Sequence, residues 1–531
     1  MISESYDYVI IGAGSAGCVL ANRLSADPRK QVLLLEAGPA DHNPFIHIPA
    51  GISKTFIHPT LNWGYKTEPD PELESREVYW PRGKTLGGSS AINGMIYIRG
   101  QAQDYDDWQA AGCTGWSWKD VLPIFRGLER HEDGASAWHG GDGELAISHP
   151  RFEHPASQQF IDACRAAGHP ATPDFNGSDQ HGAGFYNFTI NKGIRASSAT
   201  AFLRPIRKRG NLTVLTRAHA ERLLFDGKCV TGLCFMYRGT RRSVKAGEVI
   251  VSAGAINSPQ LLLLSGIGPA EQLKSLGIDV THDLPGVGEN LHDHLLIQHL
   301  AEVPEAHSIN RQMQGWRLFP QVLRYLALRD GLLTIGASQA AAFLKSDPSL
   351  DRPDIQLMFK PYTLEMLEDK IRPASRPGWT TAASPLRSKS RGWLRLKSAD
   401  PHVPPMMHPN LLGHEYDRHL AVMGLKIIRD IFASPPFASI ARETVPGTNV
   451  QSDEDLLRFV RSAAGSMYHP VGTCRMGTDP LAVVDSQLRV RGIRGLRVAD
   501  ASVMPQIVSG NTNAATIMIG AKAAQMIVED R

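Results

Sequence analysis

The chain has 531 residues, and its 56 basic and 53 acidic side chains leave a formal net charge of only +3. This balance excludes the basic excess that is typical of nucleic-acid-binding proteins, so we expect no nucleic-acid partner. An apolar content of 42% excludes a disordered chain. At roughly 100–200 residues per domain, the length predicts about three units or two large interleaved ones.

The cysteines and the apolar segments bear on the compartment. Six cysteines without metal-ligand spacing indicate reduced thiols, no metal site and a cytoplasmic protein. No apolar stretch approaches the ~20 residues that a transmembrane segment needs. Peripheral membrane contact stays open because residues 316–328 mix Trp, Phe, Leu and Tyr with arginines at roughly helical spacing. We expect this segment to pack on its own protein, with Pro320 limiting any helix there.

The first predicted elements form a β-α-β unit, with a strand at 6–11, a helix at 15–24 and a second strand at 31–35. Residues 12–17 read Gly-Ala-Gly-Ser-Ala-Gly and fit G-x-G-x-x-G. These glycines suit a tight turn, close approach of the backbone to a pyrophosphate and close helix–strand packing. Glu36 ends the second strand, where a carboxylate can accept hydrogen bonds from a ribose diol. The sequence therefore predicts a bound dinucleotide.

The later elements predict an α/β protein with an inserted domain. Strands at 212–215, 248–252 and 495–498 and a last helix at 514–528 extend the α/β pattern. The middle of the chain, about 302–451, carries no nucleotide motif, so we expect a second domain there. Its predicted elements are strands at 354–360 and 392–396 and a helix at 415–431.

A second glycine-rich segment narrows the choice of dinucleotide. Residues 82–93 read Arg-Gly-Lys-Thr-Leu-Gly-Gly-Ser-Ser-Ala-Ile-Asn. With so few bulky side chains, backbone amides of this loop can approach a flat ring or a phosphate. The same composition also fits an ordinary Ω-loop.

Together with five further motifs, these two segments resemble the glucose-methanol-choline (GMC) oxidoreductases, from residue 6 to about 528. The further motifs are Ser-Ala-Gly-Ala-Ile-Asn-Ser-Pro-Gln at 252–260 leading into 264–268, Pro-Gly-Val-Gly-Glu-Asn-Leu-His-Asp-His at 285–294, Tyr-His-Pro-Val-Gly-Thr-Cys at 468–474, Val-Ala-Asp-Ala-Ser at 498–502 and Asn-Thr-Asn at 511–513. The resemblance implies bound FAD and oxidation of an alcohol to an aldehyde or ketone.

The resemblance also implies the domain organisation and the cofactor contacts. We expect a Rossmann-like FAD-binding domain at 1–155, 196–300 and 465–531, and a substrate-binding domain, built on an antiparallel sheet with helices, at 156–195 and 301–464. The implied contacts are Gly12, Gly14, Ser15 and Ala16 at the pyrophosphate, Glu36 at the adenosine ribose, Ala220 at the adenine, Asn93, Gly94, Met95 and Ile96 along the isoalloxazine ring, Asp500 and Ala501 on the ribityl side, Asn511 and Thr512 at the pyrimidine end, and Ala37, Trp63, Gly88, Ser90, Ala253 and Tyr468 elsewhere around the cofactor.

Two side chains are the predicted catalytic residues. Removing a hydride from an alcohol carbon requires loss of the hydroxyl proton, and a neutral histidine is the natural acceptor. His469 occupies the family's base position. Asn511 stands where the family has histidine or asparagine, and its amide can donate a hydrogen bond to the substrate oxygen without titrating. We expect Asn513 to cap the last helix.

Departures from the family pattern narrow the predictions for the FAD linkage and for the substrate. Ile92 stands where some members carry a histidine that binds FAD covalently, so we expect non-covalent FAD. Residues 333–344 contain Ser338 and Gln339 but no acid to face a quaternary ammonium, which disfavours choline and favours a small uncharged primary alcohol. The electron acceptor stays open between a quinone, a dye-type acceptor and oxygen, with a preference for a dehydrogenase.

Other interpretations are retained or set aside. An FAD-containing hydroxynitrile lyase on the same fold is the main alternative, and a non-enzymatic dinucleotide-binding protein is a third. The spacing of His292 and His294 around Asp293 would suit a metal, but we expect these residues to serve packing of the flavin domain. Serines within 252–265 are interpreted as loop and cap residues because no G-x-S-x-G elbow is present.

Overall fold

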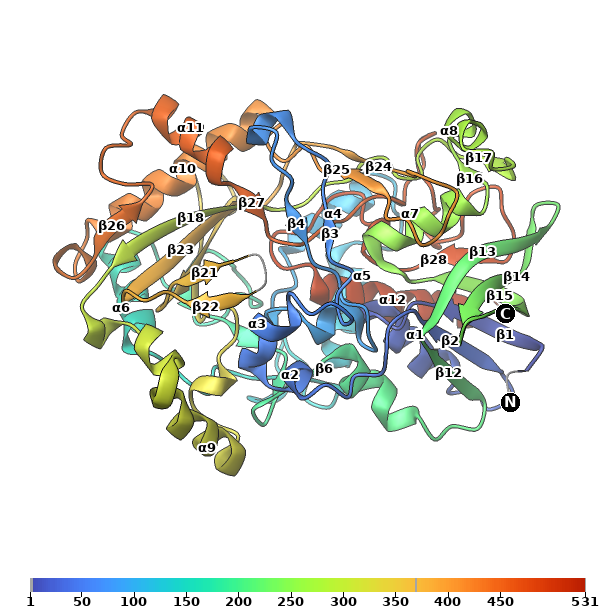
Figure 1. Ribbon diagram of the computed structural model, residues 1–531, viewed down its shortest axis with the longest axis horizontal. Helices are drawn as coiled ribbons and strands as arrows, with labels where there is room; N and C mark the ends of the chain where they lie inside the picture. The colour runs from blue at the N-terminus through green and yellow to red at the C-terminus, as the bar shows by residue number, and fades with distance from the viewer. Residues whose placement is uncertain (1–2, 368–369, 531) are drawn as a thin grey trace.

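The computed structural model describes residues 3–367 and 370–530, and two large sheets occupy opposite sides of the molecule (Figure 1). The first sheet has the order β12-β2-β1-β15-β14-β13, with β28 beside β15. Its strands are β1 (Ser5–Ile11), β2 (Val32–Glu36), β12 (Leu212–Thr216), β13 (Ala218–Asp226), β14 (Cys229–Tyr237), β15 (Thr240–Val251) and β28 (Leu496–Val498).

The predicted β-α-β unit is confirmed. Strand β1 pairs in parallel with β2 and with β15, and α1 (Ser15–Leu24) connects β1 to β2. Every residue of β2 is buried, as expected for a parallel strand covered on both faces. The last helix, α12 (Asn513–Glu529), packs on α1 so closely that a Cβ on Gly520 would lie 2.7 Å from the Cα of Ala16. The two ends of the chain therefore meet beside the nucleotide motif.

The second sheet is antiparallel, with the order β26-β18-β23-β20-β19-β8 and β27 paired to β18. One face packs on α6 (Pro155–Ala166) and α10 (Glu415–Phe432), whose apolar residues share a core with alternate residues of β20. The opposite face is turned toward the first half of the molecule and carries the site described below. Its strands are β8 (Gly182–Phe185), β18 (Leu295–Glu302), β19 (Ala340–Leu344), β20 (Ile355–Lys360), β23 (Gly378–Pro385), β26 (Arg442–Val445) and β27 (Gly465–Ser466).

These two sheets confirm the predicted fold class, a mixed α/β fold with a Rossmann-like sheet and an antiparallel sheet. The predicted domain boundaries stay a prediction. Strand β18 runs across the predicted boundary at residue 300, and β27, which begins just after the predicted boundary at residue 464, pairs with β18. The strand expected at 392–396 forms as β24 (Trp393–Arg395), but it pairs with β25 (Met406–His408) outside the large sheet. Four further helices are α4 (Ala102–Ala110), α5 (Trp118–Leu128), α7 (Gly254–Leu264) and α11 (Asp453–Ala463).

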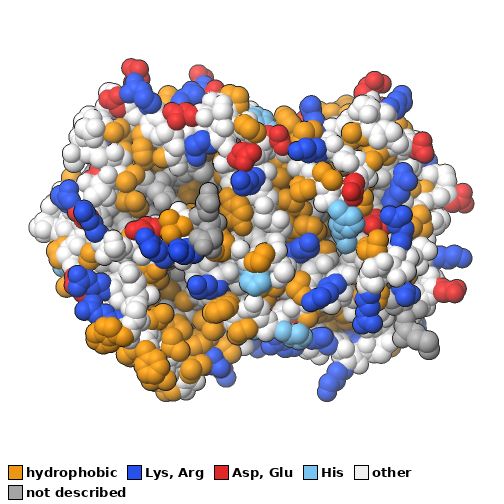
Figure 2. All heavy atoms as spheres, viewed as in Figure 1, with side chains coloured by type: hydrophobic (Ala, Val, Ile, Leu, Met, Phe, Trp, Pro, Cys, Tyr) orange, Lys and Arg blue, Asp and Glu red, His pale blue; other side chains and the backbone are white. Residues whose placement is uncertain are grey.

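The expectation that residues 316–328 pack on the protein is wrong. They form α9 (Leu318–Leu328), in which Pro320 occupies the first turn, where a proline is tolerated. Of this helix only Tyr325 is buried, and a patch of orange side chains is visible in Figure 2 where α9 lies in Figure 1. The exposed fractions are 80% for Trp316, 64% for Phe319, 50% for Leu323, 60% for Leu326 and 67% for Leu328. We refer to these five residues as the α9 face.

Within the described parts of the chain, no helix combines the length and the apolar character that crossing a bilayer would require.

Candidate active site

The predicted site residues gather around one cavity of about 450 Å³ that both sheets line. Its walls include the ends of β1 and β2, the turn before α1, and residues of β18 and β20. All of the predicted cofactor-binding residues line it except Ser90. The Ser90 hydroxyl instead donates to the Gly87 carbonyl at 2.6 Å and accepts from the Ser198 amide at 3.0 Å. Ser90 therefore supports the loop from behind.

The cofactor end of the cavity is made of backbone. Gly12 has a φ of +98°, and a Cβ there would lie 2.5 Å from the Ser252 carbonyl oxygen. A Cβ on Gly88 would lie 2.7 Å from the Cα of Gly14, so the two glycine-rich loops touch backbone to backbone. Helix α1 has Gly14 as its N-cap and no side-chain cap. Its first amides are thus free to bind phosphate, and this cradle fits the pyrophosphate of FAD.

Glu36, the last residue of β2, lines the same cavity. Its two carboxylate oxygens accept from the Ala13 amide at 3.1 Å and the Gly38 amide at 2.8 Å. Burial raises the pKa of Glu36 to about 7, against the lowering effect of these two hydrogen bonds. Each oxygen keeps a further lone pair, so ribose hydroxyls can still donate to it. The carboxylate and the phosphate cradle together fit the adenosine half of FAD.

His469 belongs to a chain of hydrogen bonds that fixes its protonation. The Leu386 carbonyl can only accept, so His294 Nε2, which lies 2.9 Å from it, carries the proton of that ring. Burial lowers the pKa of His294 to about 4, so the ring is neutral and its Nδ1 is a bare acceptor. The Nδ1 atom of His469 lies 3.0 Å away and must donate to it. The Nε2 atom of His469 is therefore left with a lone pair.

The pKa of His469 also favours a neutral base. Burial, with a smaller contribution from His294, lowers this pKa well below its usual range. The Nδ2 atom of Asn511 lies 3.2 Å from the bare Nε2 of His469. The Oδ1 atom of Asn511 is buried and has no hydrogen-bond partner among residues 3–367 and 370–530. A neutral base and an amide thus lie side by side in the wall of the cavity.

Asp293 holds the backbone of this histidine in place. One of its oxygens accepts from the amides of His294 and His469, both at 2.7 Å, and the other accepts from Trp80 Nε1 at 2.8 Å and from the Ser466 hydroxyl. The preceding residue, Tyr468, has a φ of +65°. A positive φ is strained for a residue other than glycine, and the hydrogen bonds of the Asp293 carboxylate hold the turn in this conformation.

The Leu-His-Asp-His motif has a closer relation to the site than we predicted. His292 does serve packing, since its Nε2 accepts from the Ile507 amide at 2.9 Å. His294 instead contacts His469 directly, and the sequence analysis missed this role. The motif itself is the only signal that could have suggested it, because 175 positions separate the two histidines.

The expectation that Asn513 caps the last helix is wrong. The N-cap of α12 is Thr512, and no side chain caps it. The side-chain oxygen Oδ1 of Asn513 accepts from the Ser15 hydroxyl at 2.8 Å, so this side chain connects α12 to the start of α1. Thr512, Asn513 and Thr516, at the start of α12, line the cavity. Both helices thus present uncapped N-termini to the cofactor region.

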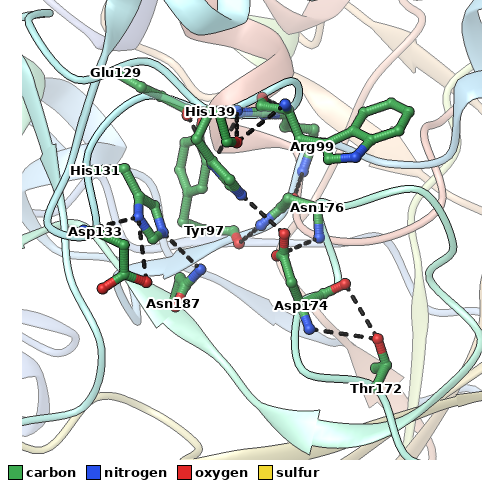
Figure 3. A network of polar contacts seen from close by, with 12 residues as sticks. Tyr97, Arg99, Glu129, His131, Asp133, His139, Thr172, Asp174, Asn176 and Asn187 are labelled. Carbon is green, nitrogen blue, oxygen red and sulfur yellow. Dashed lines mark hydrogen bonds and ion pairs between the residues drawn. The ribbon is translucent and has the colours of Figure 1, made fainter.

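A buried polar network stabilises the strand that follows the ring-lining loop, β5 (Ile96–Tyr97) (Figure 3). Arg99 and Glu129 form an ion pair in which both side chains are fully buried. His139 bridges Glu129 at 3.0 Å and Asp174 at 2.9 Å, and these two carboxylates raise its pKa to about 9 against the opposing effect of burial. The network holds β5 through Tyr97, whose hydroxyl donates to Glu129, and its charged members do not line the cavity.

The other end of the cavity is lined by side chains of the antiparallel sheet. Alternate residues of β18 and β20 point into it, with Met358 and Leu296 supplying apolar surface. Lys360, Gln298 and Thr380 supply polar groups. The sequence analysis identified none of these residues, because alternation along a strand does not tell which face meets a site.

A dinucleotide cradle at one end of a cavity and a neutral histidine with an amide at the other define a dinucleotide-dependent oxidoreductase. Residues 6–296 and 388–520 match the GMC oxidoreductase family. The chain therefore belongs to that family, and the resemblance found from its motifs is confirmed. It is an FAD-dependent enzyme of the alcohol dehydrogenase type that acts on CH–OH groups.

Individual relatives extend along nearly the whole chain. It is 47% identical to an alcohol dehydrogenase (acceptor) of Pseudomonas putida, over 98% of this chain and 96% of that protein. It is 43% identical to human mitochondrial choline dehydrogenase, over 99% of this chain and 90% of that protein. The solved structure of pyridoxine 4-oxidase from Mesorbium loti matches with a TM-score of 0.89 at 32% identity, covering 99% of both chains.

Proposed function

We propose that the enzyme oxidises a primary alcohol to the aldehyde, with His469 as the base. The observation that carries this proposal is the bare Nε2 of a neutral His469 beside the Nδ2 of Asn511 at the cavity end. Nε2 takes the hydroxyl proton, and the Asn511 amide donates to the oxygen as negative charge develops there. Bound FAD supplies the acceptor for the hydride that leaves the alcohol carbon.

The residues that hold FAD follow from the same cavity. We assign the pyrophosphate to Gly12, Gly14 and the first amides of α1, and the ribose to Glu36. Ile92 lines the cavity where covalently flavinylated members have histidine, which supports non-covalent FAD. The electrons then pass to a quinone, a dye-type acceptor or oxygen. The name of the Pseudomonas relative, which specifies an acceptor, supports a dehydrogenase.

We also propose a cytoplasmic enzyme whose α9 face binds the surface of an anionic bilayer. Five large apolar side chains are exposed there on about three helical turns, as in helices that lie in a membrane interface. Residues 305–330 carry four arginines against one glutamate and one aspartate, a net charge that suits anionic headgroups.

The decisive experiment mixes purified holoenzyme with hexanol in the absence of oxygen. Loss of the visible absorbance of oxidised flavin is expected, and His469→Ala should lower its rate by about 10²–10⁴-fold while FAD stays bound. A near-normal rate in His469→Ala would show that another group is the base. His419→Ala is a matched control, because His419 does not line the cavity.

The lyase alternative gives the opposite readout. A hydroxynitrile lyase releases an aldehyde and cyanide from a cyanohydrin with no net redox change. Its flavin absorbance would not bleach with any alcohol, and cyanide would appear on addition of a cyanohydrin. Bleaching without cyanide release would exclude this alternative.

A further inference from the structure

Two polar side chains at the substrate end of the cavity have no partner that the structure describes. Lys360 lines the cavity, and its ammonium makes no hydrogen bond or ion pair with residues 3–367 or 370–530. Ser338 also lines the cavity and is 1% exposed, and its hydroxyl has no partner in the same parts of the chain. A buried hydroxyl without a partner is uncommon and costly, and Lys360 is half-buried on the cavity wall without a countercharge, so both groups require an explanation.

The strand register brings these two residues together. Ala340 of β19 pairs with Phe359 of β20, and the Gln339 amide donates to the Phe359 carbonyl. Continuing this antiparallel register past the end of β19 pairs Lys360 with Gln339 and leaves Ser338 one position further along the neighbouring chain. Gln339 points elsewhere, since its side-chain oxygen accepts from the Ser157 hydroxyl at 2.9 Å. Ser338 and Lys360 therefore lie on neighbouring segments at the end of β19 and β20, and both line the cavity.

The charges around the cavity are divided between its two ends. The described carboxylates that line it are Glu36 and Asp500, and both accept backbone N–H groups in the cofactor half. At the substrate end the described lining contains Lys360 and no acid. Burial lowers the pKa of Lys360, in keeping with an ammonium that lacks a nearby countercharge.

We propose that Lys360 and Ser338 form a subsite for a carboxylate group on the alcohol substrate, so that the substrates are ω-hydroxy carboxylates. This inference rests on the proposed alcohol oxidation, and it replaces the uncharged alcohol expected from the sequence with an anionic one. A carboxylate would accept from the ammonium and from the hydroxyl, which gives both groups the partners they lack. A quaternary ammonium such as choline would instead meet a like charge.

The same face gives the rough length of the substrate. Met358 lies two residues before Lys360 on the same face of β20, roughly 7 Å away along the strand. Met358 shares an apolar cluster with Met467, which is two positions before His469. A substrate whose hydroxyl lies at His469 and whose carboxylate lies at Lys360 must therefore carry an apolar chain of several carbons across Met358.

The test compares two substrates of equal chain length in the FAD-loaded enzyme with a saturating dye-type acceptor. The wild type should have a higher kcat/KM for ω-hydroxyhexanoate than for hexanol, through a lower KM. In Lys360→Met the kcat/KM for the hydroxy acid should fall about 10–100-fold more than that for hexanol, as expected for a lost charge-assisted hydrogen bond. Lys360→Arg should keep part of the preference.

Controls separate the subsite from general effects. Lys397→Met removes one exposed lysine outside the cavity, and it should leave the ratio of the two kcat/KM values as in the wild type. If Lys360→Met is poorly folded, Ser338→Ala provides a second variant, with an expected loss of preference of several-fold. Lys360→Glu should shift the preference toward choline.

Two results would overturn the subsite. One is a wild type that oxidises hexanol and the hydroxy acid equally well, and the other is a Lys360→Met variant that slows both substrates by the same factor. In both cases alcohol oxidation itself would stand. Failure of the flavin to bleach with hexanol or any other alcohol would instead contradict the proposed function.

Discussion

The two ends of the cavity recognise their ligands in different ways. At the cofactor end, Gly12, Gly14 and Gly88 form a cavity wall of backbone, and the uncapped helix α1 offers its first amides as hydrogen-bond donors. At the substrate end, side chains on one face of the antiparallel sheet do this work, with Met358 and Lys360 on β20. Recognition by backbone requires glycine at fixed spacing and leaves a motif in the sequence. Recognition by side chains on a sheet leaves only the alternation of inward and outward residues along each strand, which does not identify the binding residues.

The largest expected effect comes from filling the backbone contact at the cofactor end. In Gly88→Ala the new Cβ would meet the Cα of Gly14 at 2.7 Å, and Gly88 has a φ of +52°. We expect loss of bound FAD and a free energy of unfolding lower by at least about 1–3 kcal/mol, from the strain at this φ alone. The flavin-to-protein ratio and the thermal midpoint measure both effects.

Gly127→Ala is the matched control for this substitution. Gly127 lies in α5, and an added Cβ meets nothing within 4 Å. Alanine should stabilise the helix slightly there, with FAD retained. Equal FAD content in the two variants would show that the close approach of the loops is dispensable.

The next effect concerns His294, which accepts the Nδ1 proton of His469. In His294→Phe the Nδ1 proton of His469 loses its acceptor, so the ring is no longer held in the tautomer that leaves Nε2 bare. We expect kcat to fall about tenfold or more, as for other losses of orientation, while FAD stays bound. An unchanged kcat would contradict the positioning role.

The pH profile of kcat/KM distinguishes a positioning role of His294 from a merely structural one, because only a positioning role would change the profile. Because the pKa of His469 lies well below its usual range near 6.5, the base is deprotonated at neutral pH. The kcat/KM of the wild type should therefore stay level as pH falls from 8 to about 6.5 and decline only at lower pH. His294→Phe should change the position of this acidic limb, because His294 contributes to the lowered pKa.

A smaller effect, on the affinity for FAD, is expected at Glu36, which we assign to the ribose. The pKa of Glu36 is raised to about 7, and ribose hydroxyls donate best to its ionised form. FAD binding should then release a proton, so the affinity of the apoprotein for FAD should rise as pH increases through about 7. Glu36→Gln should weaken binding and remove this pH dependence. Titration of apoprotein with FAD at several pH values tests both statements, and a pH-dependent Glu36→Gln variant would contradict the assignment.

The smallest effect on turnover is expected outside the cavity. Replacing Trp316 and Phe319 by serine should weaken sedimentation with anionic phospholipid vesicles at least tenfold, because the apolar contact is lost. Turnover of hexanol with a soluble acceptor should change little. Leu481→Ser is the control, since Leu481 is 47% exposed elsewhere on the chain. Equal vesicle binding by the two variants would show that the α9 face is not the contact.

The contrast between the two ends also explains what the sequence could predict. The β-α-β unit and the glycine loops lie in motifs whose spacing reflects backbone mechanics, whereas His469 was predicted from the family resemblance. The structure brings the glycine loops and His469 to one cavity. His294 was missed because its partner His469 lies 175 positions away. Lys360 was missed because alternation along a strand does not tell which face meets a site. The error over Asn513 has the same cause, since its partner Ser15 lies 498 positions away. The exposed α9 face was missed because amphipathic spacing does not tell whether a partner element covers the helix.

The contact between α1 and α12 has a consequence for how the enzyme is made. Ser15 bonds to Asn513, and Ala16 lies against Gly520, so the N-terminal cradle is completed by the last twenty residues of the chain. His469 and Asn511 also come from that end. During synthesis the nucleotide motif therefore precedes its partner Asn513 by 498 positions. We expect FAD to be captured only once the residues of α12 have been synthesised and packed on α1.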